Sequence, residues 1–97
     1  MALKIVWTPK ADEGLEKVLE YLDKKWTVLE ILKLEQNLNK LLNHIKEFPE
    51  SSPKTTLYKN LYKGFVDKNN YIIYRINIEE DFIEIINFRG TKQSNIY

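Results

Sequence analysis

The chain has no cysteine, a single histidine, and only three glycines and three prolines among its 97 residues. The lack of cysteine excludes disulfide frameworks, thiolate metal sites and cysteine nucleophiles, and it permits a reducing compartment. No segment approaches the roughly 20 apolar residues of a membrane span, and no charged leader precedes a long apolar run. We therefore expect a cytoplasmic protein with no membrane partner.

A large excess of charge of one sign is also missing. Fifteen Lys and Arg against fourteen Asp and Glu give a formal net charge of +1. This balance argues against a general polyanion binder but leaves local patches open, and we expect no direct sequence-specific DNA binding by the chain alone. The length and the 43% hydrophobic content are those of one compact domain, so we expect residues 1–97 to form a single unit.

Familiar catalytic and cofactor motifs are absent too. The chain has no glycine-rich phosphate loop, no Gly-x-Ser-x-Gly and no His/Glu metal spacing, so we expect no cofactor and no metal. His44 stands on a predicted helix among Asn37, Lys40 and Glu47, and nothing in the sequence points to a partner base or a metal ligand for it. We interpret His44 as a solvated surface residue.

Hydrophobic periodicity predicts two helices after a first strand at residues 3–8. Thr8 can cap the first helix and Pro9 fits its first position, and apolar residues at helical spacing carry it to about residue 25. Thr27 with Glu30 is a capping-box pattern that starts the second helix, which runs to Phe48. So short a connection predicts an antiparallel helical hairpin. The apolar seam of the second helix is Ile31, Leu34, Leu38, Leu41, Ile45 and Phe48.

Three further strands are predicted, at residues 57–66, 71–78 and 82–88, separated by short turns that favour an antiparallel meander. The order is β-α-α-β-β-β. The predicted fold class is α+β, with the antiparallel helical hairpin packed on one face of a mainly antiparallel four-stranded sheet. Alternation in residues 71–78 leaves Tyr71 and Arg75 on the open face. The side chains expected to face the helices are those of Ile72, Tyr74, Ile76 and Ile78.

Charge is segregated along these strands. Residues 54–75 hold five Lys and Arg and one Asp, a local balance of +4, whereas residues 76–88 hold four acidic residues and no base, a balance of −4. One interpretation is a basic ridge that meets phosphate or an acidic protein segment. The other is that these lysines protect an edge strand from aggregation and pair with the acidic turn. The polar tail, residues 89–97, is either a frayed terminus or a contact arm beside the open sheet face.

Four segments spread over nearly the whole chain, residues 5–11, 48–51, 71–76 and 85–93, carry a family resemblance. In order and spacing they resemble the RelE/ParE superfamily of type II toxin–antitoxin toxins, often labelled plasmid stabilisation proteins. The resemblance implies a small toxin that arrests growth and is neutralised by a cognate antitoxin protein.

The resemblance implies one of two targets. RelE-like members are ribosome-dependent endoribonucleases, which make the ribose 2′-hydroxyl of mRNA attack the adjacent phosphate. ParE-like members lack the RelE-type residues and poison DNA gyrase. Two RelE-type arginines fall at about Tyr71 and Thr91, whereas Tyr97 matches the RelE-type C-terminal tyrosine. Because the bidentate phosphate contacts of arginine are poorly replaced, the resemblance favours a gyrase inhibitor over an RNase.

Whether the chain is an enzyme depends on which of these targets it has, and a non-catalytic toxin-fold binding module is a third alternative. The catalytic candidates of a RelE-like RNase are Tyr97, Lys92 and Arg75. The residues expected to meet the target, whether gyrase or the ribosome with its mRNA, are Arg89, Lys92, Gln93, Tyr97, Lys59, Lys63, Tyr71 and Arg75.

Overall fold

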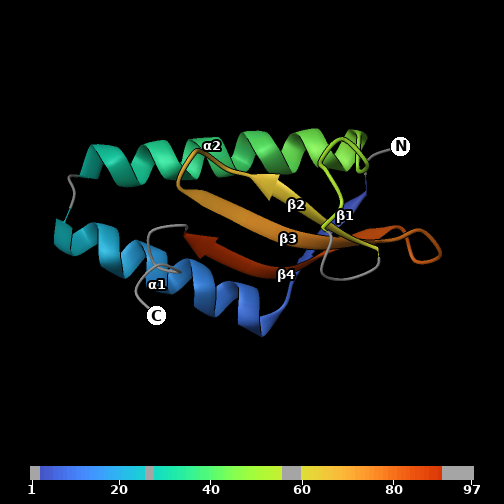
Figure 1. Cartoon of the computed structure of the whole chain (residues 1–97), viewed down its shortest axis with the longest axis horizontal. Coiled ribbons are helices and arrows are strands. Elements are labelled where there is room, and N and C mark those ends of the chain that lie inside the picture. Colours follow the sequence, from blue (N-terminus) through green and yellow to red (C-terminus); the bar gives the residue numbers. More distant parts are fainter. Residues whose placement is uncertain (1–2, 26–27, 56–59, 91–97) are drawn as a thin grey trace.

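The computed structural model describes residues 3–25, 28–55 and 60–90, with the backbone alone for residues 22–25. Within these ranges a four-stranded sheet is covered on one face by two antiparallel helices (Figure 1). No helix in the described ranges is long and apolar enough to cross a membrane. The elements are β1 (Lys4–Trp7), α1 (Pro9–Lys25), α2 (Val28–Glu47), β2 (Leu61–Phe65), β3 (Asn70–Asn77) and β4 (Phe82–Gly90).

The sheet has the strand order β1-β4-β3-β2. β2, β3 and β4 form the predicted antiparallel meander, and β1 pairs with β4 in parallel, with Ile5 opposite Ile83. The predicted α+β class and the mainly antiparallel sheet are thus confirmed. Of the strand predicted at residues 57–66, the structure shows β2 at Leu61–Phe65, with Asn60 in a turn before it; residues 57–59 lie outside the described residues. Residues 53–55 pair with β2 from the other side, and the Lys63 N–H donates to the Pro53 carbonyl at 2.9 Å.

Both helices lie close to their predicted positions. The Thr8 hydroxyl accepts a hydrogen bond from the Ala11 N–H at 3.2 Å, which makes Thr8 the cap of α1 as predicted. The predicted cap at Thr27 lies outside the described residues. α2 ends at Glu47, one residue earlier than predicted. As a consequence Phe48 does not join the apolar seam, and 57% of its surface is exposed.

The hydrophobic core lies between the sheet and the helices. The side chains of Ile72 and Tyr74 in β3 are fully buried, and Ile76 packs against them. Ile78 was expected on the same side, but it is 74% exposed because β3 ends at Asn77. The buried residues of the helices are Ala11, Val18, Leu34, Leu38 and Ile45.

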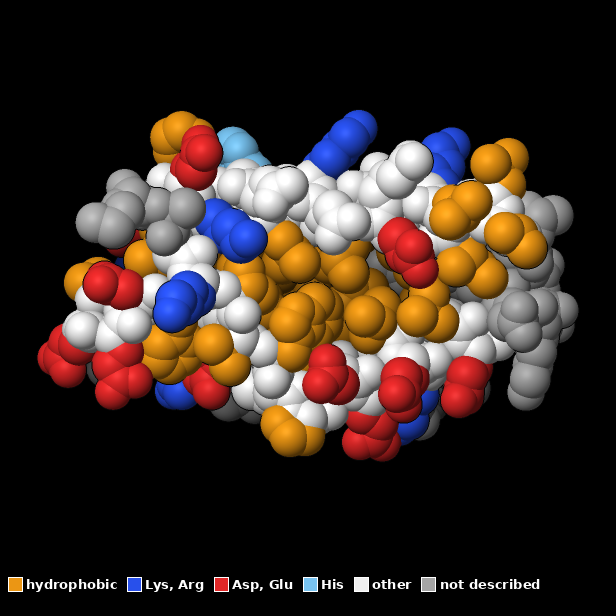
Figure 2. Space-filling model, turned by 180° about the vertical axis from the view of Figure 1, so that it is seen from behind, with side chains coloured by type: hydrophobic (Ala, Val, Ile, Leu, Met, Phe, Trp, Pro, Cys, Tyr) orange, Lys and Arg blue, Asp and Glu red, His pale blue; other side chains and the backbone are white. Residues whose placement is uncertain are grey.

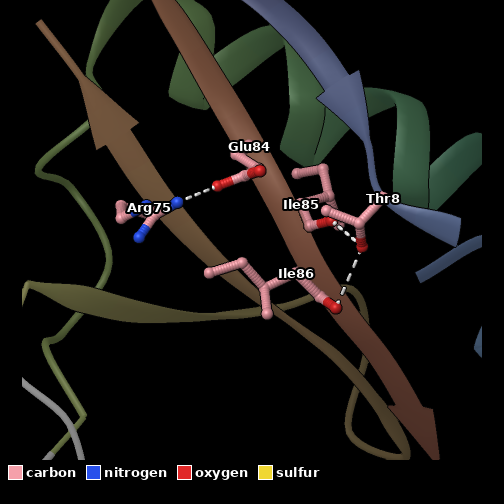
Figure 3. Close-up of polar contacts among 5 residues, drawn as sticks. All are labelled: Thr8, Arg75, Glu84, Ile85 and Ile86. Atoms are coloured by element: carbon pink, nitrogen blue, oxygen red, sulfur yellow. Dashed lines mark hydrogen bonds and ion pairs between the residues drawn. The ribbon is translucent and has the colours of Figure 1, made fainter. Parts of the chain in front are cut away.

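A β-bulge in β4 shifts the alternation of its side chains. Tyr74 pairs with Ile85, but the neighbouring Ile73 pairs with Asn87, so Ile86 is an extra residue in β4. After the bulge Phe88 is the buried residue, at 1% exposure. The Thr8 hydroxyl lies 2.8 Å from the Ile85 carbonyl oxygen and 3.1 Å from that of Ile86, and donates to this pair of carbonyls (Figure 3). The cap of α1 is therefore tied to the bulge.

Close backbone contact fixes α1 against β4. A Cβ atom at Gly14 would lie 2.2 Å from the carbonyl oxygen of Phe88, so only glycine fits there. Ala11, one turn earlier, is fully buried. α1 therefore lies beside β4 just beyond the bulge, past the stretch in which β1 pairs with that strand.

Candidate target-binding surface

The register of the strands arranges the side chains of the open sheet face in rows. In the first row Phe65 of β2 is opposite Tyr71 of β3, which in turn is opposite Arg89 of β4. These residues lie on the open face because their neighbours in sequence point into the core. The next two rows are Lys63, Ile73 and Asn87, and then Leu61, Arg75 and Glu84.

Cations and aromatic rings gather at one end of this face. The Lys63 ammonium lies 4.3 Å from the centroid of the Tyr71 ring and 5.2 Å from that of Phe65, which is cation–π geometry. Arg89 is exposed and forms no ion pair with any other described residue. We call Lys63, Phe65, Tyr71 and Arg89 the basic–aromatic cluster. It combines one cation held over two rings with a second whose guanidinium faces solvent.

Arg75 has a different environment. It lies directly opposite Glu84, and its guanidinium donates a hydrogen bond to the Glu84 carboxylate (Figure 3). The two side chains are 55% and 25% exposed, so the pair adds at most about 1 kcal/mol to stability. Its main effect is electrostatic, because the charge of Arg75 is already matched by a carboxylate. The basic segment 54–75 and the acidic segment 76–88 meet at this pair.

The structure brings together three of the predicted target-binding residues, Lys63, Tyr71 and Arg89, and places Arg75 in the row next to that of Lys63. Arg89 is not in a polar tail as expected, because β4 continues through it to Gly90. It stands in the sheet, opposite Tyr71. The remaining predicted residues, Lys59, Lys92, Gln93 and Tyr97, lie outside the described residues.

One member of the cluster was missed by the sequence analysis. Phe65 is 52% exposed and its ring centroid lies 6.0 Å from that of Tyr71. The signal for it was available, because residues two apart in a strand share a face, so Lys63 on the open face implies Phe65 there as well.

The described part of the chain has neither a cluster of metal ligands nor a histidine on the open face. No three His, Asp or Glu side chains in the described ranges could hold a metal ion together. His44 is exposed on α2, where its ring lies 5.3 Å from that of Phe48, so it is not on the open face. Burial raises the pKa of the Tyr74 hydroxyl, an effect that hydrogen bonding to Ser52 partly opposes. Tyr74 lies in the core, so this shift concerns stability.

Solved structures with the same fold come from toxin–antitoxin systems. A chain of the RelBE2 toxin–antitoxin complex from Mycobacterium tuberculosis has a TM-score of 0.65 and 14% identity, covering 93% of this chain and 99% of that chain. The YoeB/ParE toxin from Agrobacterium tumefaciens has a TM-score of 0.63 and 16% identity, covering 91% of this chain and 98% of its own. A chain of the intact E. coli RelBE complex has a TM-score of 0.63 and 16% identity, with coverage of 92% and 96%.

Sequence comparison adds the family. No curated protein matches the chain. A family model does match it, that of the ParE toxin of the type II toxin–antitoxin system parDE, and the match covers residues 5–95. The predicted membership of the RelE/ParE superfamily is therefore confirmed, and the chain belongs to the ParE toxin family of type II toxin–antitoxin systems.

Proposed function

We propose that this toxin arrests growth by poisoning DNA gyrase in the cytoplasm, that it does not cleave RNA, and that a cognate antitoxin neutralises it. The observation that carries the proposal is the pairing of Arg75 with Glu84. An RNase of the RelE type needs an unmatched cation for the charged phosphorane, a base for the 2′-hydroxyl and an acid for the leaving oxygen. Arg75, the catalytic candidate among the described residues, already has its charge matched by a carboxylate.

The residues around Arg75 support the same proposal. A phosphate that approached the Arg75 guanidinium would also come close to the Glu84 carboxylate, and the two negative charges would repel each other. The neighbouring row holds Lys63, Ile73 and Asn87. Neither Ile73 nor Asn87 is an acid or a base, and the Lys63 ammonium lies over the rings of Phe65 and Tyr71 in the row beyond. The match to the ParE toxin family also favours gyrase as the target.

A ribosome-dependent RNase is the alternative, and the basic–aromatic cluster favours it. Lys63, Tyr71 and Arg89 offer two cations and a phenol within two adjacent rows. Lys92 and Tyr97 could complete such a site from the C-terminal segment, where a lysine and a tyrosine would serve as charge stabiliser and acid. In either case we propose that the target meets the open face through the cluster, together with Lys59, Lys92, Gln93, Tyr97 and Arg75.

The antitoxin has a separate surface available on the other side of the molecule. Figure 2 shows a band of apolar side chains along the middle of the helical face, between α2 above and α1 below. The beginning of α2 adds Val28, Leu29 and Leu32, which are 72%, 71% and 48% exposed. Contiguous apolar surface of this kind is typical of protein–protein interfaces. We propose that the antitoxin covers this band.

Controlled expression in bacteria tests the target. We expect growth arrest with DNA damage signalling, no codon-phased cuts when primer extension is run on translated mRNA, and recovery when the partner gene is co-expressed. Arg75→Gln should keep part of its toxicity, because the gyrase proposal gives this residue a contact with the target but no catalytic role, and Arg89→Gln should lose toxicity at equal soluble expression. Codon-phased cuts that disappear in Arg75→Gln would reverse the assignment in favour of the RNase.

A further inference from the structure

A pocket of about 750 Å³ lies where the end of α2 meets the turn between β3 and β4, at one end of the molecule (Figure 1). Most of its wall is apolar, and the apolar side chains are those of Leu3, Phe48, Pro49, Ile76 and Ile78. Phe48 and Ile78 are 57% and 74% exposed, so part of this wall faces solvent. Pockets of about 300–1,000 Å³ with apolar walls hold drug-sized ligands, so this one has room for an aromatic side chain.

The polar part of the same pocket is mostly acidic. Three carboxylates line it, those of Glu47, Glu50 and Asp81. One lysine, Lys46, lines it as well, which leaves a local balance of −2 when histidine is counted as neutral. None of the three carboxylates forms an ion pair with another residue in the described ranges. α2 ends at this place, and the negative end of its dipole adds to the field. We call this site the acidic pocket.

The basic–aromatic cluster has the complementary properties. The ring of Phe65 is 52% exposed, and the Lys63 ammonium lies 5.2 Å from its centroid. Arg89 is exposed in the same cluster and forms no ion pair with any residue that the structure describes. The cluster therefore presents an exposed ring with two cations beside it. An apolar pocket with carboxylates around it accepts a partner of this composition, because both the apolar surfaces and the charges match.

One molecule cannot join its own cluster to its own acidic pocket. Tyr71 of the cluster stands near the start of β3 on the open face, whereas Ile76 of the pocket stands near its end and packs on the helical side. With a rise of about 3.4 Å per residue, these positions are about 17 Å apart along the strand. The net charge of the chain is only +1, so two copies do not repel each other strongly. The segregation of charge along the sequence thus makes the chain complementary to a second copy of itself.

We propose that the chain associates head to tail, with the basic–aromatic cluster of one copy docked in the acidic pocket of the next. Phe65 is the apolar anchor of this contact, and Lys63 and Arg89 lie beside the carboxylates of the pocket. A contact between two different surfaces leaves a free cluster at one end and a free pocket at the other, so the oligomer grows with concentration. If the cluster also meets the target, which rests on the proposed function, a docked copy is held inactive.

Sedimentation velocity of the purified full chain tests this contact over about 1 μM to 1 mM, the range in which weak complexes form. The weight-average sedimentation coefficient should rise with concentration. It should fall again between about 0.1 and 1 M salt, over which the Debye length shortens from about 10 to 3 Å. Phe65→Ser removes the anchor without changing the charge, so it should also shift the chain towards monomer.

Two double variants separate the two surfaces. The pocket variant carries Glu47→Gln and Glu50→Gln, and the cluster variant carries Lys63→Gln and Arg89→Gln. Each should raise the dissociation constant by about tenfold or more. An equimolar mixture keeps one native cluster and one native pocket, so it should form a dimer with the affinity of the parent contact and no larger species.

The controls make the same changes of charge elsewhere on the exposed surface. Glu16→Gln with Glu20→Gln on α1 matches the pocket variant, and Lys33→Gln with Lys40→Gln on α2 matches the cluster variant. Both controls should associate within about twofold of the parent, since isolated surface charges contribute little. Thermal unfolding of every variant shows that the fold is retained.

Three results would overturn the proposal. A chain that stays monomeric over the whole concentration range has no such contact. Equal losses in the controls and in the two double variants would mean that overall charge, and not these surfaces, drives association. A mixture that remains monomeric would mean that the cluster and the pocket are not partners. The measurement contains neither gyrase nor DNA, so its failure and the failure of the proposed function are distinguishable.

Discussion

Gly14 is a residue at which one methyl group would disturb the packing of a helix. Alanine favours helices by about 1 kcal/mol over glycine, so Gly14→Ala would stabilise an isolated α1. In the folded chain the methyl would lie 2.2 Å from the Phe88 carbonyl oxygen, and this neighbour is backbone of β4, which cannot turn aside as a flexible side chain could. We expect a net loss of about 1–3 kcal/mol in unfolding free energy by urea titration. Glu20→Ala on the exposed side of α1 is the control, and a more stable Gly14→Ala would refute the close contact.

The buried hydroxyl of Tyr74 should make the free energy of unfolding depend on pH in the alkaline range. Burial raises the pKa of its hydroxyl above the ordinary value of about 10. The neutral hydroxyl donates to the Pro49 carbonyl at 2.8 Å. Because the pKa is raised in the folded state, the neutral hydroxyl contributes to the free energy of unfolding. This contribution is fully present below about pH 10 and is lost as pH rises from there through the folded-state pKa.

Tyr74→Phe separates this effect from the ionisation of other groups. The variant should lose about 1 kcal/mol at neutral pH with the hydrogen bond, and its stability should then fall less steeply than that of the parent above about pH 10. Urea unfolding at a series of pH values measures both slopes. Parallel curves of unfolding free energy against pH for the two proteins would show that Tyr74 does not control the loss of stability at alkaline pH.

The position of Arg89 inside β4 could not be predicted from the neighbouring residues. Arg-Gly after an apolar strand is an ordinary sequence for the start of a tail, and no local signal extends the strand. What extends it is the partner strand, since Asn70 opposite Gly90 and Tyr71 opposite Arg89 continue the β3–β4 pairing. Phe65 was recoverable by alternation, whereas the approach of Lys10 and Lys17 to Arg89 depends on how α1 docks.

At the scale of elements, Thr8 joins the cap of α1 to the bulge of β4. Its hydroxyl accepts from the Ala11 N–H and donates to the carbonyls of Ile85 and Ile86. Thr8→Val keeps the shape and removes the hydroxyl, so we expect a loss of about 1–2 kcal/mol in unfolding free energy. Thr8→Ser retains the hydroxyl and should lose clearly less. If Thr8→Val is as stable as the parent, or more stable than Thr8→Ser, then shape and not hydrogen bonding is what the site requires.

The seam of α2 gives a second prediction at this scale, because its members differ in burial. Leu38 is 7% exposed, so Leu38→Ala should cost about 2–5 kcal/mol through lost burial and a residual cavity. Phe48 continues the same sequence period but lies beyond the end of the helix and is 57% exposed, so Phe48→Ala should cost about 1 kcal/mol or less. Chemical denaturation of the pair measures the difference. Equal costs would mean that Phe48 belongs to the core after all.

The elements were predictable where period and capping agree, as at Thr8-Pro9 and in the seam from Leu34 to Ile45. They were less predictable where a pairing partner decides the outcome. The bulge is such a case: two adjacent isoleucines interrupt the alternation of β4, but only the register against β3 identifies Ile86 as the extra residue. The early end of β3 at Asn77, which leaves Ile78 exposed, is another.

At the scale of the whole molecule, each of the two faces carries one of the two interfaces that we propose with the antitoxin and the target. The helical face carries the apolar band for the antitoxin, and the open sheet face carries the basic–aromatic cluster for the target. The segregation of charge along the sequence becomes spatial in the sheet, where Arg75 and Glu84 join the basic and acidic segments. The order of elements and the helical layer followed from the sequence. The parallel pairing of β1 with β4 did not, because nothing local in residues 4–7 specifies which strand they join.

The gyrase target is tested most directly with purified components. The toxin is incubated with DNA gyrase, ATP and relaxed plasmid, and the DNA is deproteinised and separated on a gel. The predicted result is a loss of supercoiled product with accumulation of linear plasmid, the mark of trapped cleavage complexes, and both effects should vanish when equimolar antitoxin is added. Normal supercoiling by gyrase in the presence of a toxin preparation that cuts mRNA on translating ribosomes would contradict the proposed function.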